Sequence, residues 1–279
     1  MAFYSFTYTV NSIKGNPERE EHAQNIHDYM GKVTTPLGTP TISLTNKKEC
    51  WEWLEANPDF NIDLVGYNPG HYSKSQVIRK FSKRDGWKYG EIGVWASNFL
   101  AWKAFVNAPQ DCLILFEDDL IIQDDFMHTL HTYMDELPED WEIFYFFVDP
   151  STHVFYNPNE HHINKDHVCT VYQDWSNACY VINKKAASKL YSEIQVNPID
   201  LPVDWHILKR LDVFNVYTVL PTAYIPCSLV PQIKSSFQSS QKRWDLSGPY
   251  SEWGVDDKGI PYSPLAYVNL LEKEYEKRD

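Results

Sequence analysis

The sequence predicts an α/β protein built around a buried central sheet. An uninterrupted apolar run at residues 112–116 ends directly at three consecutive carboxylates, Glu117, Asp118 and Asp119. A run of this kind, with β-branched and aromatic content, is typical of a strand buried on both faces. A second such run lies at residues 142–148, and segments with helical periodicity alternate with the strand-like ones. This alternation is the signature of the α/β class.

The expected elements of the N-terminal part follow from local composition. Aromatic and β-branched residues favour strands at residues 3–10 and 40–45. Acidic residues in the first turn favour a helix over residues 18–30, because they complement the helix dipole. Asn46 is a good N-cap for a further helix over residues 47–57.

The segment from residue 58 to residue 86 has neither helical nor strand periodicity and carries several lysines and arginines. A loop of this length inside a compact domain is usually functional, and its charge suits anionic phosphates; a solvated loop is the alternative. It leads into the best helix pattern of the chain, residues 90–107, where Ile92, Trp95 and Phe99 begin one apolar stripe.

The elements after the acidic strand alternate in the same way. Helical periodicity covers residues 126–137, ended by Pro138, and residues 184–196 form an amphipathic helix. Strands are expected at residues 142–148, 168–172, 178–182 and 214–220. We expect one domain over residues 1–240 and a C-terminal extension over residues 241–279, packed on it or flexible, in which only residues 265–277 have a helical pattern.

Composition limits the classes of function. The 279 residues carry a net charge of −13, and lysines and arginines never stand in runs longer than a pair. Nucleic-acid binding through phosphate neutralisation is therefore not expected. No apolar stretch approaches the ~18 residues of a membrane helix, and the N-terminus lacks the features of a signal peptide. The sequence therefore predicts a soluble protein without a transmembrane segment.

The three adjacent carboxylates are the strongest chemical signal. Neighbouring like charges repel, so a cation or solvent must screen them. Mn²⁺ or Mg²⁺ would do so through oxygen ligands and would bring a phosphate ester with it. Ligands of α/β sheets bind at the carboxyl ends of the strands, where these acids stand. A solvated acidic turn is the alternative, because short motifs often occur by chance.

Several short motifs stand in the following order: G-E-I-G-V-W-A-S-N from Gly90, L-I-L-F-E-D-D from Leu113, Y-V-I-N-K-K-A-A-S-K-L from Tyr180 and L-P-V-D-W from Leu201. In this order they resemble glycosyltransferase family 25, which includes lipooligosaccharide and collagen galactosyltransferases. The resemblance covers residues 1–240. Val94 and Asn98 depart from the family pattern, which usually has Cys and His at these positions.

The resemblance implies a GT-A fold, a nucleotide-binding domain with a central mixed, mostly parallel sheet flanked by helices. It also implies a metal-dependent, inverting transfer of a sugar, such as galactose or glucose, from a UDP-sugar to a saccharide or glycan acceptor. The expected location is the cytoplasm, peripheral to a membrane where a membrane carries the acceptor. Neither a nucleic-acid partner nor a particular oligomeric state is implied.

The resemblance gives the acidic motif the role of a D-x-D metal site. Glu117 or Asp119 is expected to hold Mn²⁺ or Mg²⁺ across the donor diphosphate, and Asp118 to position the ribose or the sugar. The metal would neutralise the charge that grows on the departing UDP.

Inversion requires a carboxylate that takes the proton of the acceptor hydroxyl. In the L-P-V-D-W motif Asp204 is the first candidate, and Asp200 is the second. The alternative role of Asp204 is an N-cap for a helix over residues 205–211, because Asp is a favoured cap.

Five other residues are expected at the nucleotide through the resemblance: Asn11, Arg19, Glu91, Ser97 and Asn98. Asn98 keeps a hydrogen-bonding group but lacks the titratable ring of the family's His.

Two other functions would use the same residues. A catalytically inactive glycosyltransferase-like module would bind a sugar or a partner protein, and the altered Ser97–Asn98 pair is its support. A metal-dependent nucleotide-sugar hydrolase would use the same acids with water as the acceptor. The intact E-D-D and P-V-D motifs favour the transferase.

Overall fold

The computed structural model describes residues 4–12, 16–44, 47–62, 89–148, 150–172, 177–199 and 202–229. The strands are β1 (Phe6–Asn11), β2 (Thr35–Pro36), β3 (Cys112–Glu117), β4 (Leu120–Ile122), β5 (Ile143–Tyr145), β6 (Val168–Thr170), β7 (Cys179–Asn183), β8 (Val216–Val219) and β9 (Cys227–Leu229). Seven of them form one sheet in the order β2-β1-β3-β7-β5-β8-β6, and β4 pairs with β9 in a separate two-stranded sheet.

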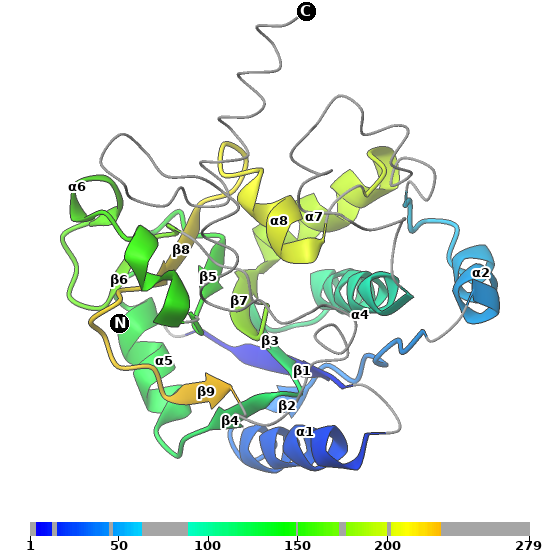
Figure 1. Ribbon diagram of the computed structural model, residues 1–279, viewed down its shortest axis with the longest axis horizontal. Coiled ribbons are helices and arrows are strands. Elements are labelled where there is room, and N and C mark those ends of the chain that lie inside the picture. The colour runs from blue at the N-terminus through cyan, green and yellow to red at the C-terminus, as the bar shows by residue number, and fades with distance from the viewer. Residues whose placement is uncertain are drawn as a thin grey trace, which may run out of the picture.

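The helices are α1 (Pro17–Met30), α2 (Lys47–Ala56), α4 (Tyr89–Val106), α5 (Phe126–Met134), α6 (Pro158–His161), α7 (Lys184–Val196), α8 (Val203–Leu208) and the 3-10 helix η2 (Pro150–Phe155). Figure 1 shows α4, α7 and α8 over one face of the main sheet and α1 and α5 over the other. Each layer has its own core. Trp95 and Trp102 of α4 are fully buried in one core, and Ile26, Met30 and Phe126 are fully buried in the other. The predicted α/β class is therefore confirmed.

The main sheet is mixed, as expected. Strands β2, β1, β3, β5 and β8 run in one direction, and β7 and β6 run antiparallel to them. Because β7 lies between β3 and β5, its N-terminal end meets the C-terminal ends of both neighbours. The carboxyl ends of β1, β3 and β5 and the start of β7 therefore share one rim of the sheet.

The register of β3 divides its residues between the two cores. Leu115 lies opposite Tyr180 of β7, and both belong to the core beside α4. Phe116 lies opposite Cys179, and both belong to the core beside α1. Side chains alternate along a strand, so Glu117 continues the row of Leu115 toward α4 and α8.

Two expectations for the strands need correction. Residues 40–44 form no strand, because side chains hold the backbone there: Thr41 Oγ1 donates to Val10 O (3.0 Å), and Ile42 N donates to Ser97 Oγ (2.9 Å). The strand expected over residues 142–148 ends at Tyr145. The N–H groups of Phe146 and Phe147 both donate to Cys179 O (3.1 Å each), so the regular ladder stops there.

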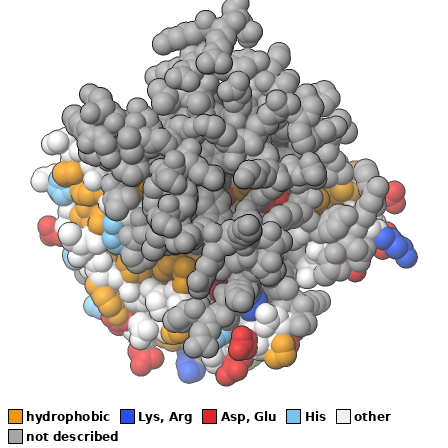
Figure 2. Space-filling view, in the orientation of Figure 1, with side chains coloured by type: hydrophobic (Ala, Val, Ile, Leu, Met, Phe, Trp, Pro, Cys, Tyr) orange, Lys and Arg blue, Asp and Glu red, His pale blue; other side chains and the backbone are white. Residues whose placement is uncertain are grey.

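The 3-10 helix η2, the helix α6 and the strand β9 were not predicted from the sequence. The extension over residues 241–279, its helical pattern and residues 63–86 of the expected loop lie outside the described residues. Among the described helices, none is both long and apolar enough to cross a membrane. Acidic side chains are spread around the outline of the face shown in Figure 2, in keeping with the net charge of −13.

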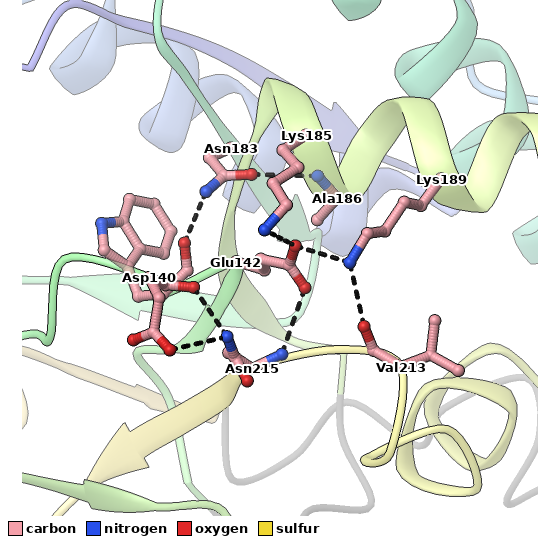
Figure 3. A network of polar contacts seen from close by, with 9 residues as sticks. Asp140, Glu142, Asn183, Lys185, Ala186, Lys189, Val213 and Asn215 are labelled. Atoms are coloured by element: carbon pink, nitrogen blue, oxygen red, sulfur yellow. Dashed lines mark hydrogen bonds and ion pairs between the residues drawn. The ribbon is translucent and has the colours of Figure 1, made fainter.

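A buried ion network closes the sheet at the rim opposite the acidic motif (Figure 3). Glu142, directly before β5, is 1% exposed and accepts from Lys185 Nζ (2.8 Å), Lys189 Nζ (2.7 Å) and Asn215 N (3.2 Å). Burial by itself would raise the pKa of Glu142, but these hydrogen bonds outweigh it and the pKa is lowered. The network therefore joins β5, α7 and the start of β8.

Candidate functional site

The acidic motif stands at the rim because its strand cannot bury it. The apolar side chains of β3 pack against residues on both faces of the sheet. Carboxylates, in contrast, need hydrogen-bonding or charged partners when they are removed from water. The strand ends at Glu117, which is half-buried. Asn11, the last residue of β1, lies directly opposite Glu117 in the parallel ladder. The structure therefore brings the expected nucleotide residue Asn11 beside the expected metal ligand.

Arg19 contacts the acidic motif from the face of the sheet that α1 and α5 cover. Its Nη1 donates to Asp118 Oδ1 at 2.7 Å, and its Nη2 lies 3.8 Å from Asp119 Oδ2. Arg19 and Asp118 are 5% and 1% exposed, so this is a buried ion pair. Asn16 caps α1 by accepting from Arg19 N (3.3 Å), and this cap fixes the start of the helix that carries the guanidinium.

The guanidinium of Arg19 has hydrogen-bonding capacity left. Its Nε and Nη2 atoms are buried and have no hydrogen-bond partner in the part of the chain that the structure describes. Buried donors without partners are costly. Arg19 can therefore hold Asp118 and still offer two donors to an anionic ligand at the rim.

Asp204 approaches the motif from the opposite face. It is half-buried in the first turn of α8, which begins at Val203. The alternative role of Asp204, an N-cap for a helix over residues 205–211, does not fit, because Asp204 lies inside α8. Burial raises the pKa of Glu117 to about 8, and the charges of Asp119, Asp118 and Asp204 add to the rise. The effect of Asp204 places its carboxylate within electrostatic reach of Glu117.

The carboxylates fit a divalent cation that takes only part of its ligands from the protein. Asp119 Oδ1 is buried without a hydrogen-bond partner in the described residues. Burial raises the pKa of Asp119, as it does for Glu117, so a cation would stabilise the charged forms of both carboxylates. No group of three or more His, Cys, Asp or Glu able to hold a metal ion was found in the described ranges. Mn²⁺ and Mg²⁺ often use one or two carboxylates and complete their shells with phosphate oxygens and water.

The motif that begins α4 joins this helix to the segment after β2. Ser97 Oγ donates to Gly93 O (2.9 Å) and accepts from Ile42 N (2.9 Å). A Cβ on Gly93 would lie 2.6 Å from Ile42 O, so only glycine permits this approach. Both residues thus have a structural task, and contact between Ser97 and a nucleotide stays a prediction.

Asn98 belongs to a buried hydrogen-bonded pair. Its Oδ1 accepts from Tyr180 OH (2.6 Å), and its Nδ2 donates to Val94 O (2.9 Å). Asn98 is 1% exposed, and Glu91 in the first turn of α4 is 3% exposed. The roles of both residues at the nucleotide also stay predictions.

Two residues complete the account of the rim. Asp200, the second candidate for the base, lies outside the described residues. Asn177, which sequence reasoning did not single out, stands directly before β7 and has a buried Oδ1 without a partner among the described residues. The only signal for Asn177 is its position next to Ala178, which pairs with Glu117. This pairing between strands cannot be recognised in the sequence.

Comparison with known proteins identifies the family to which this fold and rim belong. The model of "Glycosyltransferase family 25 (LPS biosynthesis protein)" matches residues 66–207, just over half of the chain. The chain therefore belongs to glycosyltransferase family 25 and is a glycosyltransferase, as the order of motifs predicted.

Solved structures show only a distant likeness. Mouse xyloside xylosyltransferase 1 in its apo form is 8% identical, with a TM-score of 0.31 and 77% of each chain covered. CMP:2-keto-3-deoxy-manno-octonic acid synthetase in complex with CTP is 12% identical, with a TM-score of 0.30, over 77% of this chain and 88% of that one. These values carry no functional argument. No curated protein sequence matches the chain.

Proposed function

We propose that this glycosyltransferase is a metal-dependent, inverting enzyme that moves a sugar from a UDP-sugar to a saccharide or glycan acceptor. The observation that carries the proposal is the division of carboxylates around Glu117. Asp204 acts on it from the α8 face, and Asp118 and Asp119 meet Arg19 on the α1 face. One side thus offers a proton acceptor, and the other offers charge compensation for a diphosphate.

Residues of β1, of α1 and of the acidic motif would position the donor. Asn11 at the end of β1 and the free donors of Arg19 suit the nucleotide and its phosphates. Glu117 and Asp119 would hold the Mn²⁺ or Mg²⁺. When bound, this ion would neutralise the negative charge that develops on the departing UDP.

Asp204 is the proposed general base. Its carboxylate takes the proton of the acceptor hydroxyl while the hydroxyl oxygen forms a bond to the anomeric carbon of the donor sugar. The bond between this carbon and the diphosphate breaks at the same time, and UDP leaves with the bonding electron pair. Attack from the face opposite the leaving group inverts the configuration. Asp200 is the second candidate for the same role.

Product analysis tests the proposal. The purified protein would be incubated with UDP-galactose or UDP-glucose, with MnCl₂ or EDTA, and with or without a panel of saccharide acceptors. We expect glycoside and UDP to form together only with acceptor and metal, and NMR of the product to show the inverted anomer. Equal release of free sugar with and without acceptor would instead identify a hydrolase. The absence of any product across the acceptor panel would contradict the proposal.

A further inference from the structure

Asn177 has a buried hydrogen-bond acceptor for which the described residues supply no donor. The residue is 8% exposed, and its Oδ1 is fully buried without a hydrogen-bond partner among the described residues. A buried amide oxygen that has lost water and gained no donor lowers the stability of the folded state. Since the part of the chain that the structure describes supplies no donor here, a bound ligand is a suitable source of one.

The pairing of β3 with β7 places Asn177 at the acidic rim. Phe116 pairs with Cys179, and in the next step Glu117 N donates to Ala178 O at 2.8 Å. Asn177 is the chain neighbour of Ala178, so its backbone lies one residue beyond the point at which β7 meets Glu117. The unused oxygen therefore belongs to the same rim as the carboxylates.

The order of the strands indicates which part of a ligand reaches Asn177. β3 lies between β1 and β7, so Asn11 and Arg19 stand on one side of the acidic motif and Asn177 stands on the other. This step rests on the proposed function. With the nucleotide near Asn11 and Arg19 and the diphosphate at the acidic motif, the sugar is the part of the donor that extends toward β7.

We propose that Asn177 binds the donor sugar, with its amide oxygen accepting a hydrogen bond from a sugar hydroxyl. A neutral acceptor suits an uncharged hydroxyl group, whereas the charged groups of the rim suit the diphosphate and the cation. Because the hydroxyls of hexoses differ in orientation, such a contact also contributes to the choice between donor sugars.

Calorimetry on Asn177→Leu separates this role from a structural one. Leucine has nearly the same size but no polar atoms. Binding of UDP and of UDP-galactose would be measured in MnCl₂, with UDP-glucose alongside. We expect UDP affinity to stay within about twofold of wild type and UDP-galactose affinity to fall about tenfold, the effect of losing one hydrogen bond. The melting temperature should stay the same or rise, because an unsatisfied buried atom is removed.

Asn183→Leu is the matched control on the same strand. Asn183 lies at the other end of β7, and its amide is fully used: Oδ1 accepts from Ala186 N (2.9 Å) and Nδ2 donates to Trp141 O (2.5 Å), as Figure 3 shows. Its replacement should lower the melting temperature, because it removes a helix cap, and leave the affinity for UDP-galactose unchanged. Asn177→Ser, which removes the amide without adding apolar bulk, serves as a second variant if Asn177→Leu does not fold.

Three outcomes would overturn the inference. Unchanged affinity for UDP-galactose in both Asn177 variants would show that the amide makes no contact with the sugar. An equal loss for UDP and for UDP-galactose would move the contact to the nucleotide or the cation. If the wild-type protein bound no UDP, the proposed function would fail and the inference with it, whereas tight wild-type binding that is insensitive to Asn177 would overturn the inference alone.

Discussion

Glu117 and Asp118 are neighbours in the chain but face opposite sides of the sheet. Asp118 is held by Arg19 of α1, and Glu117 lies within electrostatic reach of Asp204 of α8. Glu117 is the last residue of β3, whereas Asp118 and Asp119 lie in the turn between β3 and β4. Three consecutive acids can thus act on two different parts of a ligand, because the strand ends between the first acid and the second.

Asp204→Asn tests the proposed base. Asparagine has nearly the same shape but cannot take a proton, so turnover should fall by ~10²-fold or more. Affinity for the UDP-sugar should remain, because the cation and nucleotide residues are unchanged. Steady-state kinetics and calorimetry would measure the two quantities. Asp212→Asn, an exposed acid in the turn after α8, is the matched control and should leave both quantities unchanged. Near-normal turnover of Asp204→Asn would move the role to Asp200.

Glu117 gives the protein a pH-dependent stability in the absence of metal. Its pKa is about 8 in the folded protein against an ordinary value of 4.5. Between these values the folded state keeps a proton that the unfolded state has released, so stability falls as pH rises from 4.5 to 8. Glu117→Gln carries no such proton. As pH rises through this range, the free energy of unfolding of Glu117→Gln should increase relative to that of the wild type by about 1 kcal/mol per pH unit.

Urea denaturation at several pH values in EDTA would measure this difference. Addition of MnCl₂ at pH 8 should stabilise the wild type more than Glu117→Gln, because the cation replaces the proton as the partner of the carboxylate. The same slope with pH in both proteins would show that Glu117 is not held in the protonated form.

At the scale of the elements, the sequence predicted most accurately those helices and strands whose bounds depend on residues close by in the chain. The helix expected over residues 184–196 is α7 with the same bounds, and Asn183 caps it through Ala186 N. The strand expected at residues 40–45 failed because the backbone there bonds to distant side chains. Ser97, which accepts from Ile42 N, is 55 residues away along the chain, and no local pattern reports such a contact.

Glu142 joins three elements, and its charge should matter for stability. Glu142→Gln removes the charge that Lys185 and Lys189 share, so the free energy of unfolding at pH 7 should fall by about 1–3 kcal/mol. The pKa of Glu142 is lowered in the folded protein. The stabilisation is therefore present above about pH 4.5 and is lost as pH falls through the lower folded pKa.

Chemical denaturation at pH 7 and pH 3 would check this expectation. The difference between wild type and Glu142→Gln should be large at pH 7 and small at pH 3. Glu139→Gln, an exposed acid three residues earlier, is the control and should change little at either pH. An equal loss at both pH values would mean that shape rather than charge holds the network together.

At the scale of the whole molecule, the sequence indicated the class and the acidic rim but could not assemble the site. Arg19 and Asp118 are 99 residues apart and meet only because α1 packs against β1 and β4, the strands beside the acidic motif. Asn177 reaches the rim only because β7 is inserted antiparallel between β3 and β5. The family pattern supplied Arg19 and Asp204 as candidates, but their positions on opposite faces follow from tertiary packing alone.

The net charge of −13 makes the proposed requirement for a cation a matter of the whole protein as well as of the rim. An acidic molecule with several carboxylates at this rim repels a diphosphate unless a cation joins them. The basic guanidinium of Arg19 is already engaged by Asp118 and compensates only part of this charge. UDP binding should therefore depend steeply on the metal.

Calorimetric titration of UDP into the wild-type protein, in MnCl₂ and in EDTA, tests the central claim most directly. We expect clear binding in MnCl₂ and a loss of at least about tenfold in affinity in EDTA, since one or two carboxylates share the cation with the diphosphate. Asp119→Asn should lose the metal-dependent part of the affinity while its circular dichroism spectrum is unchanged, and Asp135→Asn, an exposed acid just after α5, should bind as the wild type does. Equal UDP affinity in MnCl₂ and in EDTA would contradict the account.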